Sequence, residues 1–329
     1  MPKYQPPFII TNTILTLVAE ISEALGRLSV QIEQEQSLSL RRINQVRTIQ
    51  GSLAIEGNTL SIEQITAILD GKHVIAPPRE ITEARNAIAA YNMLDVWQAS
   101  SVDDLLTAHK VLMTDLVDEA GKYRTGGVGV MSGETVVHMA PQAGRVQVLI
   151  ADLLAWLDKN DTPPLIASCV FHYEFEFIHP FADGNGRMGR LWQTLILSQW
   201  HSVFTEIPVE SLIYQYQEDY YSAIRQSTLS TNSAPFIEFM LTMIRNVLHE
   251  AQNDGVNDGV NDGVNDGVNE KEAQLLKLLS QQPTMTLDKL VAQTKRSKST
   301  IERRIRKLKK SGKLKRIGSD KTGHWEVTF

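Results

Sequence analysis

The sequence His179-Pro180-Phe181-Ala182-Asp183-Gly184-Asn185-Gly186-Arg187-Met188-Gly189-Arg190 decides how the rest of the chain is interpreted. Pro180 has no N–H group and its ring clashes with a preceding helical turn, so it must end the apolar helix that begins near Pro163. His179 therefore lies at the tip of that helix. The glycine-rich run 184–186 can turn sharply, and helical spacing of apolar residues resumes after it. We predict a short loop followed directly by the first turn of a second helix.

The start of this second helix is a predicted anion site. The first backbone amides of a helix have no partner within the helix, and glycines leave them unshielded. Arg187 and Arg190 are three residues apart, so they share one face of the first turn. Guanidinium groups bind phosphate oxygens bidentately. Together with the His179 imidazole and the Asp183 carboxylate, these groups indicate phosphoryl or nucleotidyl transfer.

Every specified position of 179–190 matches the Fic-family signature H-P-F-x-D/E-G-N-G-R-x-x-R, which the run therefore resembles. The resemblance implies transfer of AMP from ATP to a Ser, Thr or Tyr hydroxyl of a target protein, the chain itself included. His179 is then the general base, a role that suits a neutral imidazole near pH 7. Asp183 is implied to hold Mg²⁺ on the α- and β-phosphates, because Mg²⁺ accepts one carboxylate together with phosphates. The implied ATP-binding residues of the run, through the amides of 184–187 and the side chains of the asparagine and the two arginines, are Asp183, Gly184, Asn185, Gly186, Arg187 and Arg190.

Gly186 bears on the choice of reaction. Relatives of the Doc type, which phosphorylate, carry Lys at this position, so by resemblance the glycine favours nucleotidyl transfer. UTP or CDP-choline in place of ATP remains an alternative donor.

Ser52 and Glu56 form a second motif, ahead of the signature. Apolar residues at helical spacing predict a helix through 40–53, and Gly57 is of a type that ends helices, so Glu56 belongs to the last turn. A carboxylate there opposes the helix dipole and needs a cation or solvent. The run Ser-x-x-x-Glu-Gly resembles the inhibitory motif of Fic proteins. That motif implies that Glu56 pairs with the first arginine of the signature, here Arg187, and excludes the productive pose of the ATP γ-phosphate. A solvated surface glutamate is the alternative.

Residues 121–139 interrupt the helical pattern, and their glycines and β-branched residues predict a β-hairpin. The hairpin resembles the flap of the family, which is implied to dock an extended segment of the target protein by adding a strand to an exposed edge. Glycines there allow close approach of a nucleotide or a target backbone. We expect nucleotide contacts from Thr125, Gly126, Gly127 and Val128.

The pair Tyr220-Tyr221 follows the signature helix. In relatives a tyrosine at about this distance lines the adenine pocket, where a flat amphipathic ring suits a base. The resemblance therefore implies Tyr221, and less directly Tyr220, as ATP-binding residues. Some relatives carry Asn where this chain has Thr228. His109 and His172 lie among apolar residues and are interpreted as framework residues.

Further helices are expected from apolar periodicity and capping residues, which include a capping box formed by Ser61 and Gln64 and an N-cap at Ser101. Their expected ranges are 12–34, 61–69, 80–98, 102–117, 146–157 and 235–250.

At 329 residues and 42% hydrophobic composition, the chain is long enough for two domains. Its single cysteine, Cys169, excludes an intrachain disulfide and fits a reducing cytoplasm, and no apolar run reaches the ~18 residues of a membrane span. Residues 271–329 hold 16 Lys and Arg against 5 Asp and Glu, a net charge of +11, so the rest of the chain carries −16 of the total of −5. A basic tail on an acidic body indicates two modules with different partners, in a cytoplasmic protein without a membrane partner.

Between the two modules, Asn-Asp-Gly-Val is repeated four times over 253–268. This turn-rich composition cannot bury a core, so a flexible linker is expected. The tail predicts a C-terminal hairpin preceded by helices at 272–279, 287–293 and 298–310, an order that resembles a winged helix. The basic segment 297–310 is the expected recognition helix. DNA bound through its phosphates, a protein partner and a passive solvated surface all stay open for it.

We therefore expect an all-α protein with a Fic helical fold, a small β-hairpin flap and a C-terminal winged helix-turn-helix domain. The expected domains are an N-terminal region with the inhibitory helix at 1–110, the Fic catalytic core at 111–250, the linker at 251–269 and the winged-helix domain at 270–329. The expected function is a protein adenylyltransferase that uses ATP and Mg²⁺, is autoinhibited by Glu56 and acts on a target protein docked at 121–139. The alternative is a DNA-binding transcriptional regulator whose Fic core senses nucleotide. A homo-oligomer is left open.

Overall fold

The computed structural model describes residues 4–34, 38–127, 129–132, 135–255, 270–287, 289–290, 301, 305, 308–309, 313–317 and 324–327. Two compact units divide the chain, one at Met1–Gly259 and one at Val260–Phe329. Residues 256–269 of the expected linker at 251–269 lie outside the described residues, as do residues 133–134 in the turn of the expected flap. No helix among the described residues is long and apolar enough to span a bilayer.

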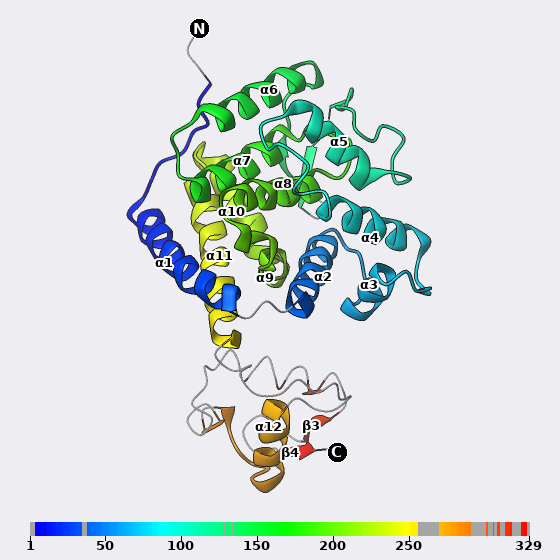
Figure 1. The fold of residues 1–329 in the computed structure, drawn as a ribbon, viewed down its shortest axis with the longest axis vertical. Helices are drawn as coiled ribbons and strands as arrows, with labels where there is room; N and C mark the ends of the chain where they lie inside the picture. The colour runs from blue at the N-terminus through cyan, green and yellow to red at the C-terminus, as the bar shows by residue number, and fades with distance from the viewer. Residues whose placement is uncertain are drawn as a thin grey trace. The chain divides into compact units, whose positions relative to one another are not determined.

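Unit 1 is helical apart from one two-stranded antiparallel sheet (Figure 1). The sheet pairs Gly129 with Met139 at one end and Ser132 with Thr135 at the other. The elements in chain order are α1 (Asn12–Gln34), α2 (Leu38–Ile55), α3 (Ile62–Leu69), α4 (Pro78–Tyr91), α5 (Val102–Met113), β1 (Gly129–Ser132), β2 (Thr135–Met139), α6 (Ala143–Lys159), α7 (Pro164–Ile178), α8 (Asn185–Trp200), the 3₁₀ turn η1 (Ser202–Thr205), α9 (Val209–Gln215), α10 (Gln217–Ser230) and α11 (Ala234–Gly255).

The centre of unit 1 is the pair α7 and α8, with α1 on one side and α3 and α4 on the other (Figure 1). Nearly every residue of α7 is buried, which explains why its sequence is apolar on all faces rather than on one stripe. Two carboxylates, Glu174 and Glu176, are exceptions to that composition and are buried as well. A single apolar core therefore surrounds the loop between α7 and α8 and holds it rigidly.

Local sequence signals place several helix boundaries as expected. The side chain of Ser61 accepts a hydrogen bond from the Gln64 amide, and the Gln64 side-chain oxygen accepts one from the Ser61 amide, which is a complete capping box. Ser101 caps α5 in the same way through the Asp104 amide. Gly57 follows α2 with φ of +89°, the left-handed conformation that ends helices.

Other boundaries differ from the prediction. The helix expected at 80–98 ends at Tyr91 and is followed by turns, because the chain must bend there to bury Trp97 against Trp192. The helix expected at 102–117 ends at Met113, and Asp115 then adopts a positive φ of 60°. α11 continues to Gly255, five residues beyond the expected end at 250 and into the first linker repeat.

Unit 2 contains α12 (Glu270–Gln281) and an antiparallel hairpin of β3 (Leu314–Ile317) and β4 (His324–Val327). Its own small apolar core includes Leu275, Leu279 and Ile301. Trp325 in β4 donates its indole N–H to the Met285 carbonyl and so fastens the hairpin to the helical part. The helix and the hairpin agree with the expected winged helix, whereas most of the expected recognition helix at 297–310 lies outside the described residues.

Candidate active site

His179 is the residue at which α7 ends. Its backbone N–H donates to the Phe175 carbonyl at 2.9 Å, and its φ and ψ of 51° and 63° are left-handed. A residue with a Cβ adopts this conformation at a cost of about 1–2 kcal/mol, so the surrounding contacts must hold it there. The prediction that Pro180 ends the helix and leaves His179 at its tip is therefore confirmed in detail.

Arg124 makes several of the contacts that keep the His179 backbone in this conformation. Its Nε donates to the His179 carbonyl at 2.7 Å, its Nη1 to Gly126 at 2.8 Å and its Nη2 to Pro141 at 2.6 Å. Its backbone N–H donates to the Pro180 carbonyl at 3.0 Å. The guanidinium is buried and ties the root of the β1–β2 hairpin to the backbone of the histidine loop, a role that the sequence analysis did not assign.

The loop after His179 is braced by two further side chains. Asn185 accepts a hydrogen bond from the Phe181 amide and donates one to the Phe181 carbonyl, both at 2.9 Å. Both polar atoms of the Asn185 side chain therefore hold the loop, and the expected contact of this side chain with phosphate stays a prediction. His109 stacks on the Phe181 ring at 3.6 Å between ring centroids.

His109 also determines where the Asp183 backbone lies. The Gly121 amide donates to its Nδ1 at 2.8 Å, so the proton of the neutral ring is on Nε2, which donates to the Asp183 carbonyl at 3.0 Å. Burial lowers the pKa of His109 to about 4, which keeps the ring in this neutral tautomer near pH 7. The interpretation of His109 as a framework residue agrees with these contacts.

α8 begins one residue after Gly184, whose φ of +82° is the left-handed turn expected of the glycine-rich run. The Asp183 carboxylate accepts a hydrogen bond from the Gly184 amide at 2.6 Å through Oδ1. The amides of the first turn of α8 have no acceptor within the helix and carry its positive end. This confirms the predicted loop and helix start, and it places a local anion site next to His179.

Arg187 and Asp183 meet at this helix start together with two residues of α4. The Arg187 Nη2 is 3.2 Å from the Asp183 Oδ1, and its Nη1 is 3.6 Å from the Glu83 carboxylate. Arg79 lies 3.4 Å from the Asp183 Oδ2. Arg187 is buried, and its Nε has no hydrogen-bond partner in the described part of the chain. A buried donor without an acceptor indicates that an anionic group belongs there.

Glu56 pairs with the second arginine of the signature and not with the first. Its Oε1 accepts from the Arg190 Nη2 at 2.7 Å, while Ser52 accepts from the same guanidinium through its hydroxyl at 3.2 Å and its carbonyl at 3.0 Å. The predicted pairing with Arg187 is therefore wrong. The reason is that α2 faces α8 at Arg190, whereas Arg187 is already engaged by Asp183 and by Glu83 from α4.

The contact of Glu56 with α8 depends on a glycine. A Cβ added to Gly186 would overlap the Glu56 Oε1 and come within 3.1 Å of the Arg190 Nη1. The Glu56 carboxylate thus lies directly over the first turn of α8, where the predicted anion site is. Burial alone would lower the pKa of Arg190, but the charges of Glu56, Tyr220 and Glu176 and the hydrogen bond to Glu56 together hold the pKa above its usual range.

Behind His179 lies a second buried carboxylate, Glu176. Its Oε2 is 3.9 Å from the His179 Nδ1, and burial raises its pKa to about 7 despite the nearby Arg190 charge. His172, one turn earlier in α7, is buried between the Gln193 amide oxygen at 2.6 Å and the Tyr220 hydroxyl at 3.1 Å. These contacts make His172 a framework residue, as interpreted from the sequence.

The two tyrosines of the adenine prediction have different environments. Tyr220 is 2% exposed with its hydroxyl on His172, so its ring belongs to the core and is not brought to the surface of the site. Tyr221 is half-buried and remains available at the rim. Thr228 contacts the Tyr173 hydroxyl at 3.1 Å. Of the flap residues, Thr125, Gly126 and Gly127 are exposed, and Val128 lies outside the described residues.

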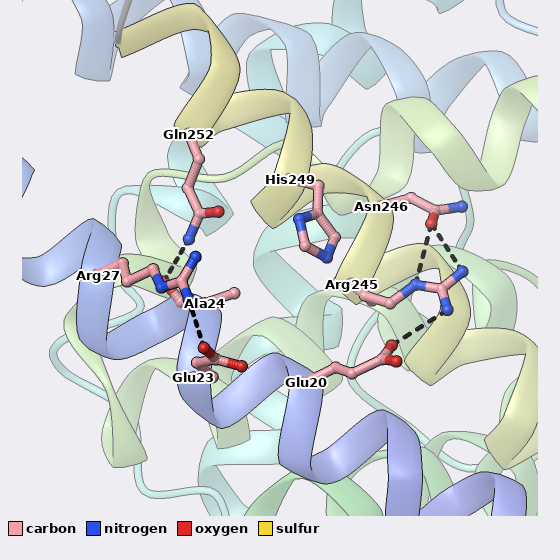
Figure 2. Close-up of a pocket in the computed structure, with 8 residues that line it drawn as sticks. All are labelled: Glu20, Glu23, Ala24, Arg27, Arg245, Asn246, His249 and Gln252. Atoms are coloured by element: carbon pink, nitrogen blue, oxygen red, sulfur yellow. Dashed lines mark hydrogen bonds and ion pairs between the residues drawn. The ribbon is translucent and has the colours of Figure 1, made fainter.

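A cavity of about 420 Å³ lies elsewhere in unit 1, between α1 and α11 (Figure 2). Its charged residues pair with each other: Arg245 with Glu20 at 3.2 Å, and Arg27 with Glu23. Figure 2 also shows Gln252 bonded to the backbone of the facing helix, where its side chain donates to the Ala24 carbonyl. Because these charges are already balanced, we assign no ligand to this cavity.

Four residues of the site were missed by the sequence analysis, namely Arg79, Glu83, Arg124 and Glu176. The sequence did carry a signal for Glu176: a carboxylate in a helix that is apolar on all faces is buried at a cost in free energy, which indicates a specific role. Arg79 and Glu83 are one turn apart on a surface helix and carry no such signal.

The fold and site together define a class of helical protein in which a histidine at one helix end is joined by a short loop to the glycine-rich start of the next helix. The family model described as Fic/DOC family matches residues 99–197. A solved Fic family protein from Desulfovibrio desulfuricans G20 is 46% identical, with a TM-score of 0.75, over 99% of this chain and 98% of that chain. This chain belongs to the Fic family.

Curated relatives cover a smaller part of the chain. The protein adenylyltransferase fic-1 of Caenorhabditis briggsae is 34% identical over 203 residues, which are 57% of this chain and 38% of that protein. The chain thus matches little more than a third of the length of this relative. A solved fragment of Fic-1 from C. elegans is 24% identical over 75% of this chain and 73% of the fragment, with a TM-score of 0.59, and shows the fold alone.

The C-terminal unit has a relationship of its own. The model of a DeoR-like helix-turn-helix domain matches residues 271–318. The expected winged helix-turn-helix in the tail is therefore confirmed at the level of fold.

Proposed function

We propose that this protein transfers AMP from ATP to a Ser, Thr or Tyr hydroxyl of target proteins, including itself. The observation that carries the proposal is the buried Arg187 Nε, which has no partner among the described residues and lies in the first turn of the helix that follows the His179 loop. A triphosphate laid across that helix start would satisfy this donor and the first amides of α8 together. The names of the curated relatives, protein adenylyltransferases, support the same reaction.

Mg²⁺ fits the residues at this place. The Asp183 carboxylate is 44% exposed; its Oδ1 accepts from the Gly184 amide and Arg187, and its Oδ2 has only the exposed Arg79 guanidinium at 3.4 Å. The described residues contain no cluster of three or more His, Cys, Asp or Glu side chains, which suits a metal that takes its other ligands from phosphates and water. When bound, Mg²⁺ would neutralise negative charge on the phosphates.

The residues of the chain then have distinct tasks in the transfer. His179 takes the proton of the target hydroxyl as the hydroxyl oxygen attacks the α-phosphorus. The bond from that phosphorus to the bridging oxygen breaks, and pyrophosphate leaves with the electron pair. The first turn of α8 and Arg187 stabilise the charge that develops on the phosphate oxygens. A positioned base contributes roughly 10²–10⁴-fold to such a reaction.

Glu56 restrains this activity in the proposal. The Arg190 side chain is 1% exposed, and its Nε and Nη2 donate to Ser52 and Glu56. One guanidinium cannot serve a carboxylate and the outermost phosphate together, so the Glu56–Arg190 pair keeps the triphosphate from its productive position. The carboxylate over Gly186 adds like-charge repulsion at the helix start.

The test is self-labelling with ATP that carries radioactive phosphorus in the α position. We expect strong covalent label on the Glu56→Gly protein, weak label on the parent and none on Glu56→Gly/His179→Ala. His73→Ala, which changes an exposed histidine in a loop, is the matched control and should keep the label. Label that survives in the His179 variant, or equal label with and without Glu56, would contradict the proposal. Competition by UTP and CDP-choline decides the donor.

Target proteins are proposed to dock at the flap. β1 and β2 pair with each other in a sheet of two strands, so each has an outer edge with main-chain groups for an added strand. Binding of an extended peptide there should protect amides of 129–132 or 135–139 from hydrogen exchange. Protection elsewhere would remove the flap from target recognition.

A DNA-binding function for the C-terminal unit is the second candidate, favoured by the DeoR-like match and by the net charge of +11 over residues 271–329. Binding to duplex DNA that weakens steeply with salt would support it. Binding of nucleotide to the Fic core without any covalent label, together with such DNA binding, would favour a regulator over an enzyme.

A further inference from the structure

The carboxylate of Glu176 has no place in the reaction described so far. It lies on α7 three residues before His179, so the two side chains share a face. Its Oε2 is 3.9 Å from the His179 Nδ1. The residue is 8% exposed, and its Oε1 is buried without a hydrogen-bond partner among the described residues. Burying a carboxylate in this way is costly and calls for a reason.

A second buried carboxylate on the same helix provides a comparison. Glu174 is 6% exposed and accepts a hydrogen bond from the Tyr4 hydroxyl at 2.8 Å. It lies two residues before Glu176 and therefore on a different face of α7. Burial raises the pKa of both carboxyl groups, but only Glu176 faces the histidine.

Two charged side chains from neighbouring elements act on Glu176: Glu56, one residue after α2, and Arg190 from α8. Burial and the Glu56 charge raise the pKa of Glu176 to about 7, while the Arg190 charge opposes the rise. On its own helix, His172 lies beside it against Gly189. The hydroxyl groups of α10 nearest to it belong to Tyr220 and Tyr221.

We propose that Glu176 is a positioning residue for His179: its carboxylate, at ion-pair rather than hydrogen-bond distance from Nδ1, favours the tautomer with the proton on Nδ1, so that the unprotonated Nε2 faces the target hydroxyl. This inference rests on the proposed function. During transfer the hydroxyl proton goes to Nε2, and the resulting imidazolium keeps its Nδ1–H against the Glu176 carboxylate. Glu176 takes no proton itself and stabilises the charge on the ring.

The same geometry links the base to the inhibitory pair. Arg190 is shared between the Glu56 and Glu176 carboxylates as a source of positive charge. When Glu56 leaves, Glu176 loses a repelling neighbour and keeps the attraction of Arg190, so its ionised form is favoured. Release of inhibition would then open the phosphate site and strengthen the base in one event.

Self-labelling in the active Glu56→Gly protein provides the first test, with Glu174→Gln as the matched control. Glu176→Gln removes the charge and keeps the shape. We expect it to slow labelling about 10- to 100-fold, a part of the whole effect of a general base, and to move the acid limb of the pH–rate profile down by about one pH unit. Glu176→Asp should recover part of the rate, because it restores the charge. Glu174→Gln should change neither quantity.

The second test does not depend on activity. The chain has 8 histidines, so ¹⁵N-histidine NMR of the full-length protein can follow the His179 ring after assignment by substitution. We expect the Nδ1–H tautomer in the parent, and a loss of that preference with a lower titration midpoint in Glu176→Gln.

If Glu176→Gln labels at the rate and pH profile of Glu174→Gln, or leaves the His179 tautomer and midpoint unchanged, the inference is overturned. If the NMR shift occurs but the Glu56→Gly protein never labels, the pairing of Glu176 with His179 stands and the proposed transfer reaction fails. The two failures are therefore distinguishable.

Discussion

Gly186→Ala should release the inhibition without any change to Glu56. A Cβ at this position overlaps the Glu56 Oε1, which is the mobile end of a side chain that is 32% exposed. The carboxylate can swing toward solvent, so the strain is relieved by leaving Arg190. The helix itself tolerates the change, because alanine is favoured over glycine within a helix by about 0.5–1 kcal/mol.

The size of the effect follows from the contact that is lost. The Glu56 Oε1 accepts from the buried Arg190 guanidinium at 2.7 Å, and hydrogen bonds that involve charged groups contribute about 1.5–3 kcal/mol. Losing that amount only in the inhibited state shifts the ratio of released to inhibited protein by roughly 10- to 150-fold, since 1.4 kcal/mol is a factor of ten. Initial self-labelling by Gly186→Ala should rise by a factor within this range.

The assay is a double-mutant cycle of self-labelling rates over the parent, Gly186→Ala, Glu56→Gly and the double variant. If the alanine acts only by displacing Glu56, it has no effect in the Glu56→Gly background. Gly26→Ala is the control, because Gly26 lies in α1 with nothing near its added Cβ. A Gly186→Ala protein that labels no faster than the parent, while the double variant labels as fast as Glu56→Gly, would refute the steric argument. A slow double variant would show instead that the nucleotide needs the same space.

Three further outcomes are expected. Arg124→Lys should lower the free energy of unfolding by about 2–4 kcal/mol in urea titrations, because one ammonium group cannot reach all three carbonyls to which the guanidinium donates. The control is Arg85→Lys on the exposed face of α4, which should leave the free energy of unfolding unchanged. Burial lowers the pKa of His109 to about 4 in the folded protein, whereas an unfolded histidine has a pKa of about 6.5. As the pH falls below about 6.5 the unfolded chain is therefore protonated first, and the free energy of unfolding drops by about 3 kcal/mol between pH 6.5 and pH 4. His109→Gln should show a shallower loss over that window, and an equal loss in both proteins would disprove the assignment. Deleting 270–329 should leave self-labelling unchanged, because the core of unit 1 contains no residue of that segment.

The histidine loop could be predicted from the sequence because its conformation is dictated locally. Pro180 must end a helix wherever it stands, and Gly184 must turn, with its φ of +82°. The capping box of α3 is local for the same reason. Each of these needs only neighbouring residues, so no knowledge of packing was required.

The partners of the side chains were harder to predict because they depend on how helices pack. Arg187 and Arg190 lie on the same face of α8, so the sequence does not say which of them pairs with Glu56. The position of α2 beside α8 brings Glu56 to Arg190. Tyr220 and Tyr221 are neighbours in sequence, so their side chains point about 100° apart around α10. Which of the two is buried depends on the face of α10 that packs against the core, and that face carries Tyr220. The side-chain amide of Asn185 can bind a phosphate oxygen or a backbone group equally well, so its sequence position alone did not predict the two bonds to the Phe181 backbone.

The two signature arginines are held by different helices, which explains how the proposed inhibitory contact can be reversible. Arg187 lies between Asp183 and Glu83 of α4, whereas Arg190 is held by Ser52 of α2 and by Glu56, one residue after that helix. Asn58, two residues after Glu56, links the two sets by donating to the Glu83 carboxylate at 2.8 Å. Withdrawal of the Glu56 side chain alone leaves this link intact, because the Glu56 side chain takes no part in it. Release should therefore change the binding of the outermost phosphate and leave the position of Asp183 unaltered. Replacing Asn58 with Ala, by contrast, should disturb Arg187 and weaken nucleotide binding even when Glu56 is absent, which separates a movement of the side chain from a movement of the whole helix.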